Sequence, residues 1–138
     1  MMKGIFISLL TLVAQQGLAQ VSPREIEASV NRIDVSCKNC EDSGGKISYC
    51  EFVRNTALDS ILNVVYKELR KEMDAASFGK LRDEQREWLK QRDDNNSANT
   101  AKMDKGDGGN ATDRALVIVK SDSDFLEKRI VYLTKKIK

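Results

Sequence analysis

Apolar residues recur at helical spacing in the middle of the chain, and this pattern predicts its clearest helix. The positions lie three and four residues apart, which places them on one face of an α-helix. No helix breaker occurs between Cys50 and the first of them, so we expect the helix to begin near Cys50 and to end or bend at Asp74–Ser77. The apolar positions are Leu58, Ile61, Leu62, Val65, Leu69 and Met73.

A second amphipathic helix is expected from about Ser77, which is a suitable N-cap residue. Acidic and basic residues occupy most of its other positions, which indicates a solvated surface with local ion pairs. Glu84 and Glu87 lie one turn apart, but nothing places them in an apolar pocket, so we interpret them as solvated. The predicted inner face consists of Phe78, Leu81, Gln85, Trp88 and Leu89.

The last apolar segment has two interpretations. The run Ala115–Val119 is rich in β-branched residues and would suit a buried strand. Apolar residues nevertheless continue at helical spacing as far as Ile137, and the lysines at the end would suit the C-terminus of a helix. We favour one helix from about Thr112 to Lys136. The alternative is a strand followed by a shorter helix, with the break at Ser121–Asp124.

The remaining segments carry weaker patterns. Residues 20–36 allow a short helix, because three apolar residues there have helical spacing. Residues 37–47 are predicted to form a turn around Asp42–Gly45. Asp94–Gly109 is predicted to be a long polar loop. The expected fold is all-α: a small helical hairpin or bundle of three main helices.

Composition limits the possible functions of this 138-residue, single-domain chain. The net charge of +2 is too small to indicate a nucleic-acid-binding protein. The absence of histidine excludes Ser-His-Asp and Cys-His catalysis and every His-ligated metal site. No glycine-rich phosphate loop or nucleophile motif is present. We therefore predict that the protein is not an enzyme and has no catalytic residue, cofactor or metal site.

Residues 1–19 have the features of a secretory signal. Lys3 supplies the positive charge, residues 4–14 are mostly apolar, and Gly17 and Ala19 are small residues at the positions that signal peptidase reads. The apolar run is about half as long as a membrane-spanning helix. The mature protein is expected to begin near Gln20, to be periplasmic or secreted, and to have no membrane contact after cleavage.

Export also determines how the three cysteines are interpreted. In an oxidising compartment, Cys37, Cys40 and Cys50 are expected to form one structural disulfide and to leave one thiol over. The Cys37–Cys40 spacing is also found in redox and zinc motifs. A thioredoxin-like site needs a βαβ context, however, and a zinc site would lack a histidine to complete it.

Several residues in order resemble the LprI-type lysozyme inhibitor family. The resemblance begins in the first predicted helix and continues through a segment of the form L…QR.WL..RD. It ends with the Gly108–Gly109 pair and an arginine in the last helix, and it covers residues 37 to 134. It leaves residues 20–36 as an N-terminal extension before a domain at 37–138. The residues that carry it include Leu58, Asp59, Leu62, Asn63, Tyr66, Gln85, Arg86, Trp88, Arg92, Asp93 and Arg129.

The resemblance implies a small helical, disulfide-bonded protein of the bacterial envelope. Its partner would be a protein, namely lysozyme or another peptidoglycan hydrolase. The first disulfide of the family would join Cys50 to Cys37 or Cys40. Family members commonly carry a second cysteine pair where Asn96 and Ser121 stand in this chain. An envelope interaction module or a toxin-immunity protein without lysozyme inhibition is the alternative function.

The motif residues are expected to be structural. Trp88 would lie in the core, Tyr66 in the core or at its edge, and Arg92 and Asp93 would tie the following loop to the bundle. Loops usually present contacts to partners, so the Asp94–Gly109 loop and an exposed turn next to the disulfide are the predicted contact regions. The turn consists of Ser43, Gly44, Gly45 and Lys46.

Overall fold

The computed structural model describes residues 20–107 and 109–138, and it forms an all-α bundle over these residues. The all-α prediction is confirmed, with four long helices instead of three. None of the helices described is long and apolar enough to cross a membrane. The predicted signal, residues 1–19, lies outside the described residues. The elements are α1 (Pro23–Asp42), α2 (Ile47–Glu72), α3 (Ala75–Lys102), the π-helical turn η1 (Met103–Asp107) and α4 (Ala111–Thr134).

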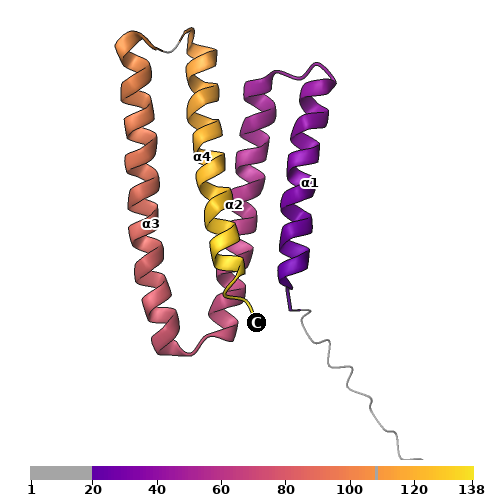
Figure 1. Ribbon diagram of the computed structural model, residues 1–138, viewed down its shortest axis with the longest axis vertical. Helices are drawn as coiled ribbons and strands as arrows, with labels where there is room; N and C mark the ends of the chain where they lie inside the picture. The colour runs from indigo at the N-terminus through magenta and orange to yellow at the C-terminus, as the bar shows by residue number, and fades with distance from the viewer. Residues whose placement is uncertain (1–19, 108) are drawn as a thin grey trace, which may run out of the picture.

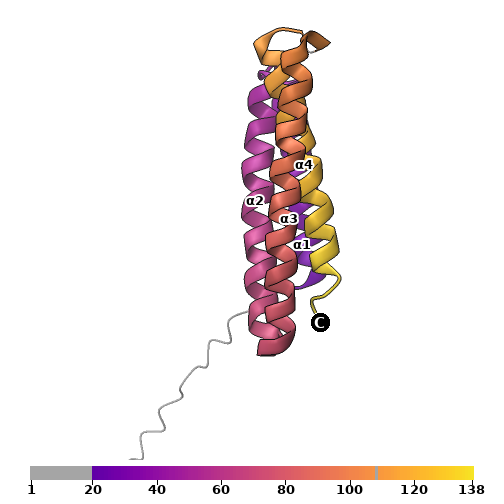
Figure 2. The ribbon, with the colours of Figure 1, turned by 90° about the vertical axis from the view of Figure 1, so that its left-hand side faces the viewer.

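The four helices run alternately up and down the long axis of the molecule (Figure 1). Helices α2 and α4 form the central pair, with α1 packed against α2 and α3 packed against α4. The view at 90° shows a narrow, elongated bundle in which the axes of all four helices are closely aligned with the long axis (Figure 2). The core therefore forms a column between α2 and α4, closed on its sides by α1 and α3.

The core residues follow the apolar spacing of the sequence. Leu58, Val65 and Leu69 of α2 are fully buried, and Ile61 and Met73 pack against the core while partly exposed. The prediction that Leu89 lies on the inner face of α3 is wrong, because its side chain is 44% exposed. Helix α3 packs mainly against α4, and Leu89 instead lines a groove on the α2 side. The other helices contribute Ile26, Val30, Leu81, Trp88, Leu126, Ile130 and Leu133.

Local capping determines where the helices begin. Ser22 and Glu25 form a reciprocal capping box at the start of α1, and Pro23 occupies the first turn. The N-cap of α3 is Asp74 and not Ser77, because the Asp74 carboxylate accepts a hydrogen bond of 2.9 Å from the backbone N–H of Ser77. Asn110 and Asp113 form a second capping box at the start of α4.

The predicted polar loop at Asp94–Gly109 is wrong over more than half of its length. Helix α3 continues to Lys102, and only a short connection around η1 precedes α4. Asn95 and Asn99 donate hydrogen bonds of 3.2 and 2.8 Å to the Ser121 hydroxyl. Amide and hydroxyl groups thus form the contact between the helices here, and an analysis of apolar spacing cannot detect such a contact.

The predicted turn at residues 37–47 is also too long. Helix α1 includes Cys37 and Cys40 and ends at Asp42, so the turn itself is only Ser43–Lys46. Both cysteines continue the helical spacing of Ile26, Val30 and Ile33, and Cys37 is buried. Cysteine behaves as a small apolar residue in such positions, so the apolar pattern of α1 is longer than expected.

The segment with two interpretations is a single helix, α4, and the strand alternative is wrong. Asp122 and Ser123 interrupt the apolar pattern but are buried in the middle of this helix. The helix ends at Thr134, so the lysines that follow do not lie in its last turn. The expected dipole contribution of these lysines is therefore not supported.

Candidate functional site

A disulfide closes the hairpin of α1 and α2 at one end of the bundle. It joins Cys40 of α1 to Cys50 of α2, with a Cα–Cα distance of 5.8 Å. Cys37 is the remaining thiol and is buried. The exposed turn Ser43–Lys46 lies between the two bridged cysteines. We call this turn, together with the disulfide, the α1–α2 tip.

Removing the disulfide, by replacing both Cys40 and Cys50 with serine, is expected to lower the free energy of unfolding by about 2 to 3 kcal/mol. The bridge closes a short loop and restricts the unfolded chain by about this amount in the loop-entropy model. Urea unfolding of the oxidised wild type and the double variant measures the difference. Equal stability of the two proteins would show that the bridge contributes little to folding.

The structure explains why both positions 44 and 45 of the tip are occupied by glycine. Gly44 has a φ of +83°, which L-residues rarely adopt. Gly45 packs directly against the bridge: a Cβ there would lie 2.6 Å from the Cys40 carbonyl oxygen and 2.8 Å from each sulfur. The Gly45 N–H also donates to that carbonyl at 2.9 Å. The turn is thus held both by a covalent bond and by close packing.

Replacing Gly45 with alanine is expected to cost about 1 to 3 kcal/mol, because overpacking moves the backbone or the bridge. Gly44→Ala is the matched variant: it has open space around its Cβ, so only the positive φ opposes it, at about 1 kcal/mol. Thermal unfolding of both variants compares the two effects. A smaller loss for Gly45→Ala than for Gly44→Ala would contradict the close packing against the disulfide.

Lys46 is exposed at the end of the tip and forms no salt bridge with any residue in the described part of the chain. Several apolar residues near this end of α1 and α2 are also exposed. Ile47, Tyr49 and Phe52 are 53%, 63% and 61% exposed, and Val35 on α1 is 59% exposed. Clustered exposed apolar residues commonly mark a contact surface. The tip thus carries an exposed lysine, and exposed apolar residues follow it on α2.

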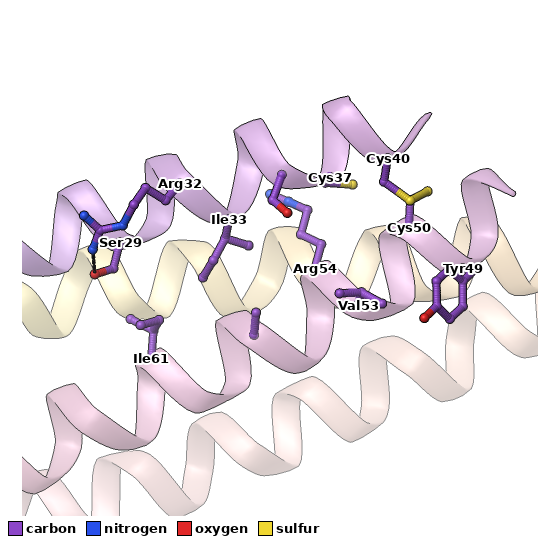
Figure 3. Close-up of a pocket in the computed structure, with 12 residues that line it drawn as sticks. Ser29, Arg32, Ile33, Cys37, Cys40, Tyr49, Cys50, Val53, Arg54 and Ile61 are labelled. Atoms are coloured by element: carbon purple, nitrogen blue, oxygen red, sulfur yellow. Dashed lines mark hydrogen bonds between the residues drawn. A yellow bond between two sulfur atoms is a disulfide. The ribbon is translucent and has the colours of Figure 1, made fainter. Parts of the chain in front are cut away.

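A groove of about 450 Å³ runs between α1 and α2 next to the tip (Figure 3). Tyr49 and the disulfide lie toward one end of it, and Ile33 and Ile61 lie toward the other. Apolar and polar side chains of both helices therefore line a groove that extends from the disulfide along the α1–α2 hairpin.

Arg54 fixes this end of the hairpin to the rest of the bundle. Its guanidinium donates to Asp34 at 2.8 Å, to Glu51 at 2.8 Å and to Glu127 at 2.6 Å, and so joins α1, α2 and α4. Burial of Arg54 opposes its charge, but the hydrogen bonds to Asp34 and Glu51 raise its pKa above the ordinary value. The tip consequently has a rigid base.

The free thiol of Cys37 is a weak nucleophile. Its sulfur lies 3.7 Å from Glu51 Oε2 and 4.0 Å from Glu41 Oε1. Burial, together with these negative charges, raises the pKa of Cys37, so the thiol stays protonated. The ligand atoms of these three residues lie within 4.8 Å of one another, but a metal ion there would compete with Arg54 for Glu51.

Arg92 is the centre of a polar network inside the bundle. It donates two hydrogen bonds of 2.7 Å to the Asp122 carboxylate and one of 3.0 Å to Asp59. Burial alone would raise the pKa of Asp122, but hydrogen bonds from Arg92, Asn55 and Asn96 outweigh burial and lower it to about 2. Arg92 lies within α3 and joins it to α2 and α4, so the predicted tie to a following loop is wrong.

Asp93, the neighbour of Arg92 in the motif, is exposed and has no side-chain hydrogen bond to a residue that the structure describes. The predicted role for it is therefore not supported by any contact.

Arg129 forms a second link between α3 and α4. It donates to Gln85 Oε1 at 2.9 Å and to Glu84 Oε1 at 2.8 Å. Glu84 is 40% exposed, so it is partly solvated, as predicted, and in addition paired with Arg129. The Arg129 guanidinium also lies 5.6 Å from the centre of the Trp88 ring. Trp88 itself is buried, at 7% exposure.

The structure brings several polar residues of the sequence motif together along one groove between α2 and α3. Sequence spacing could not predict this groove, because its two sides come from different helices. Sequence analysis also missed three residues of the buried hydrogen-bond networks, namely Arg54, Asn55 and Asp122. Their one signal in the sequence is that a polar residue interrupts an apolar pattern. The motif residues that line the groove are Asp59, Leu62, Asn63, Tyr66, Gln85, Arg86 and Arg92.

Comparison with protein families identifies the chain. The family model described as lysozyme inhibitor LprI matches residues 37–133, which is well over half of the sequence. Neither the curated proteins nor the solved structures gave a match. The matched residues begin in α1, include the tip, the Arg92 network and the α2–α3 groove, and end in α4. The chain therefore belongs to the LprI lysozyme inhibitor family.

Proposed function

We propose that this protein is exported and inhibits a lysozyme-type cell-wall hydrolase by inserting its α1–α2 tip into the cleft of the enzyme. The family description names an inhibitor. The signal-like residues 1–19 favour export. The observation that carries the proposal is the disulfide-held turn that ends in Lys46, which is exposed and forms no salt bridge with a described residue, with exposed apolar residues following on α2.

The chemistry of the target explains why a lysine would inhibit it. Glycoside hydrolysis uses two carboxyl groups, and one of them must be protonated to act as the general acid. An ammonium group within a few ångströms lowers the pKa of a carboxyl group and keeps it ionised. Lys46 in the cleft would therefore remove the acid and would also block access of the glycan to both carboxyl groups.

The rigid tip favours binding in a second way. A turn that is already ordered loses little conformational freedom when it enters a cleft. Exposed aromatic side chains are frequent centres of binding energy, and Tyr49 and Phe52 lie next to the turn. The near-neutral charge of the chain gives little long-range attraction, so affinity depends on the shape of the tip and on these contacts.

Lys46→Glu is expected to weaken inhibition by roughly tenfold or more, because it replaces an attractive charge with a repulsive one near two carboxyl groups. The measurement is turnover of labelled peptidoglycan by several lysozyme types, with calorimetry for direct binding. Lys90→Glu is the matched control: it makes the same charge change on the exposed surface of α3, where Lys90 is 70% exposed. It should leave inhibition unchanged.

The proposal fails if micromolar mature protein leaves all the tested lysozymes fully active and shows no heat of binding. An interaction module of the envelope, or a toxin-immunity protein, would then be the better interpretation. If the wild type inhibits but Lys46→Glu and Lys90→Glu lose inhibition equally, the protein is an inhibitor but the role of the tip is contradicted.

A further inference from the structure

The groove between α2 and α3 is a second candidate binding site, distinct from the tip. It measures about 390 Å³, within the range of small-molecule sites. Its nearest residue on α2, Asp59, lies about 20 Å along the helix from Lys46, given the rise per residue of an α-helix. Residues of both α2 and α3 line it, and the two helices overlap closely in the view of Figure 2.

Two exposed arginines line this groove with most of their N–H groups unpaired, and Asp59, which also lines it, is bonded to Arg92. Arg82 and Arg86 line it from α3, with side chains that are 52% and 70% exposed. Both approach one carboxylate, Asp83, at no less than 3.4 Å. The third arginine of the groove, Arg92, is already paired with carboxylates inside the bundle. One carboxylate cannot accept from all the N–H groups of Arg82 and Arg86, so these two arginines keep donors free for an anionic ligand.

The groove also offers unused hydrogen-bonding groups. Gln85 accepts from Arg129 through Oε1, which leaves its Nε2 group free to donate. The Asn63 amide and the Tyr66 hydroxyl, from α2, form no hydrogen bond with any residue in the described ranges. Together with the two arginines, these groups provide mostly donors. A ligand rich in acceptors would satisfy them.

The floor of the groove is partly apolar. Leu62 and the ring of Tyr66 lie on the α2 side, and Leu89, which is 44% exposed, lies on the α3 side. Exposed apolar surface between hydrogen-bonding groups matches a sugar ring, which has an apolar face and polar edges. A simple carboxylate or phosphate ion would leave this surface unused.

We infer that the α2–α3 groove binds an N-acetylated sugar that carries a carboxylate. The carboxylate would pair with Arg82 and Arg86, since guanidinium groups bind carboxylates through two parallel hydrogen bonds. The acetamido and hydroxyl groups would contact Asn63, Gln85 and the Tyr66 hydroxyl. Such a sugar occurs in the substrate of lysozyme-type enzymes, but the inference rests on the groove alone and not on inhibition.

Calorimetric titration of the mature protein, without any hydrolase, tests the ligand class. The probes are a disaccharide of N-acetylglucosamine and N-acetylmuramic acid, neutral diacetylchitobiose, and a short acidic peptide. The charged disaccharide is expected to bind, and the neutral one to bind roughly tenfold more weakly. The inference is overturned if the charged disaccharide shows no binding at millimolar concentration, or if either of the other probes binds equally well.

Variants of exposed residues locate the site. The double variant Arg82→Ala, Arg86→Ala is expected to lower affinity for the charged disaccharide by roughly tenfold or more, and Tyr66→Phe by a smaller factor. Lys90→Ala lies outside the groove and should bind like the wild type. Lys46→Glu should also bind normally, which separates this test from the one for the tip. Unchanged affinity in the arginine double variant would overturn the inference.

Discussion

Replacement of Asp122 with alanine is expected to lower the free energy of unfolding by about 3 to 5 kcal/mol. Its side chain is only 10% exposed and accepts two hydrogen bonds from Arg92 at 2.7 Å. Removal of one partner from a buried ion pair leaves the other charge without compensation, and such losses are typically of this size. Among the described residues, Asp59 would remain as the one carboxylate bonded to Arg92, so the charge of Arg92 would be compensated only in part.

Urea unfolding of the variants measures this loss. Asp122→Asn should be less destabilising than Asp122→Ala, because an amide oxygen can still accept a hydrogen bond from Arg92. Asp93→Ala is the matched control, since Asp93 is an exposed aspartate beside Arg92. If Asp122→Ala is no less stable than Asp93→Ala, the network does not hold the bundle together.

The same carboxylate should give the protein a specific dependence on pH. The pKa of Asp122 is about 2 in the folded protein, below its ordinary value of 3.8. A carboxyl group with a lowered pKa stabilises the folded state fully above the unfolded pKa, and this contribution disappears as pH falls from about 4 to about 2. Wild-type stability should therefore fall more steeply than that of Asp122→Asn across this range. Parallel curves would contradict the assignment.

Trp88→Ala is the second change with a large expected effect, at about 3 to 5 kcal/mol. The ring is 7% exposed and stacks on Phe125 of α4 with a distance of 5.5 Å between ring centres. Arg92 and Arg129 lie 5.8 and 5.6 Å from its centre. Only Leu81 and Trp88 are buried in the 28 residues of α3, so this contact supplies much of the apolar packing of the helix.

Thermal unfolding followed by circular dichroism compares Trp88→Ala with Leu89→Ala. Leu89 is the adjacent residue on α3, but it is 44% exposed, so its loss should cost less than about 1 kcal/mol. Trp88→Phe should lie between the two, because it keeps an aromatic ring against Phe125. Equal effects at positions 88 and 89 would show that α3 is held chiefly by its polar contacts.

The far end of the α3–α4 hairpin depends on those polar contacts. The family resemblance places a second cysteine pair at positions 96 and 121. In this chain Asn96 donates to Asp122 at 2.9 Å, and Ser121 accepts from Asn95 and Asn99. Hydrogen bonds between side chains therefore occupy the place of the expected covalent link. They stabilise the hairpin less than a disulfide would, because they do not restrict the unfolded chain.

The spacing of apolar residues was enough to predict the all-α class and much of the core. Helical spacing of Leu58, Val65 and Leu69 predicted the buried side of α2, because each turn of a helix places such residues on one face. The family resemblance also followed from the sequence, since it depends on residue types in order and the family model matches the same region. These features are local along the chain.

Contacts between residues of different helices depend on how the helices pack and could not be predicted from spacing. Spacing left the partner of Cys50 open, and the packing of α1 on α2 brings Cys40 to it. The continuation of α3 to Lys102 depends on amide contacts with Ser121, and the buried position of Asp122 depends on Arg92. The groove between α2 and α3 likewise joins residues of two helices. A polar residue shows the same character in sequence whether it is solvated or paired, so only the packed neighbour determines its role.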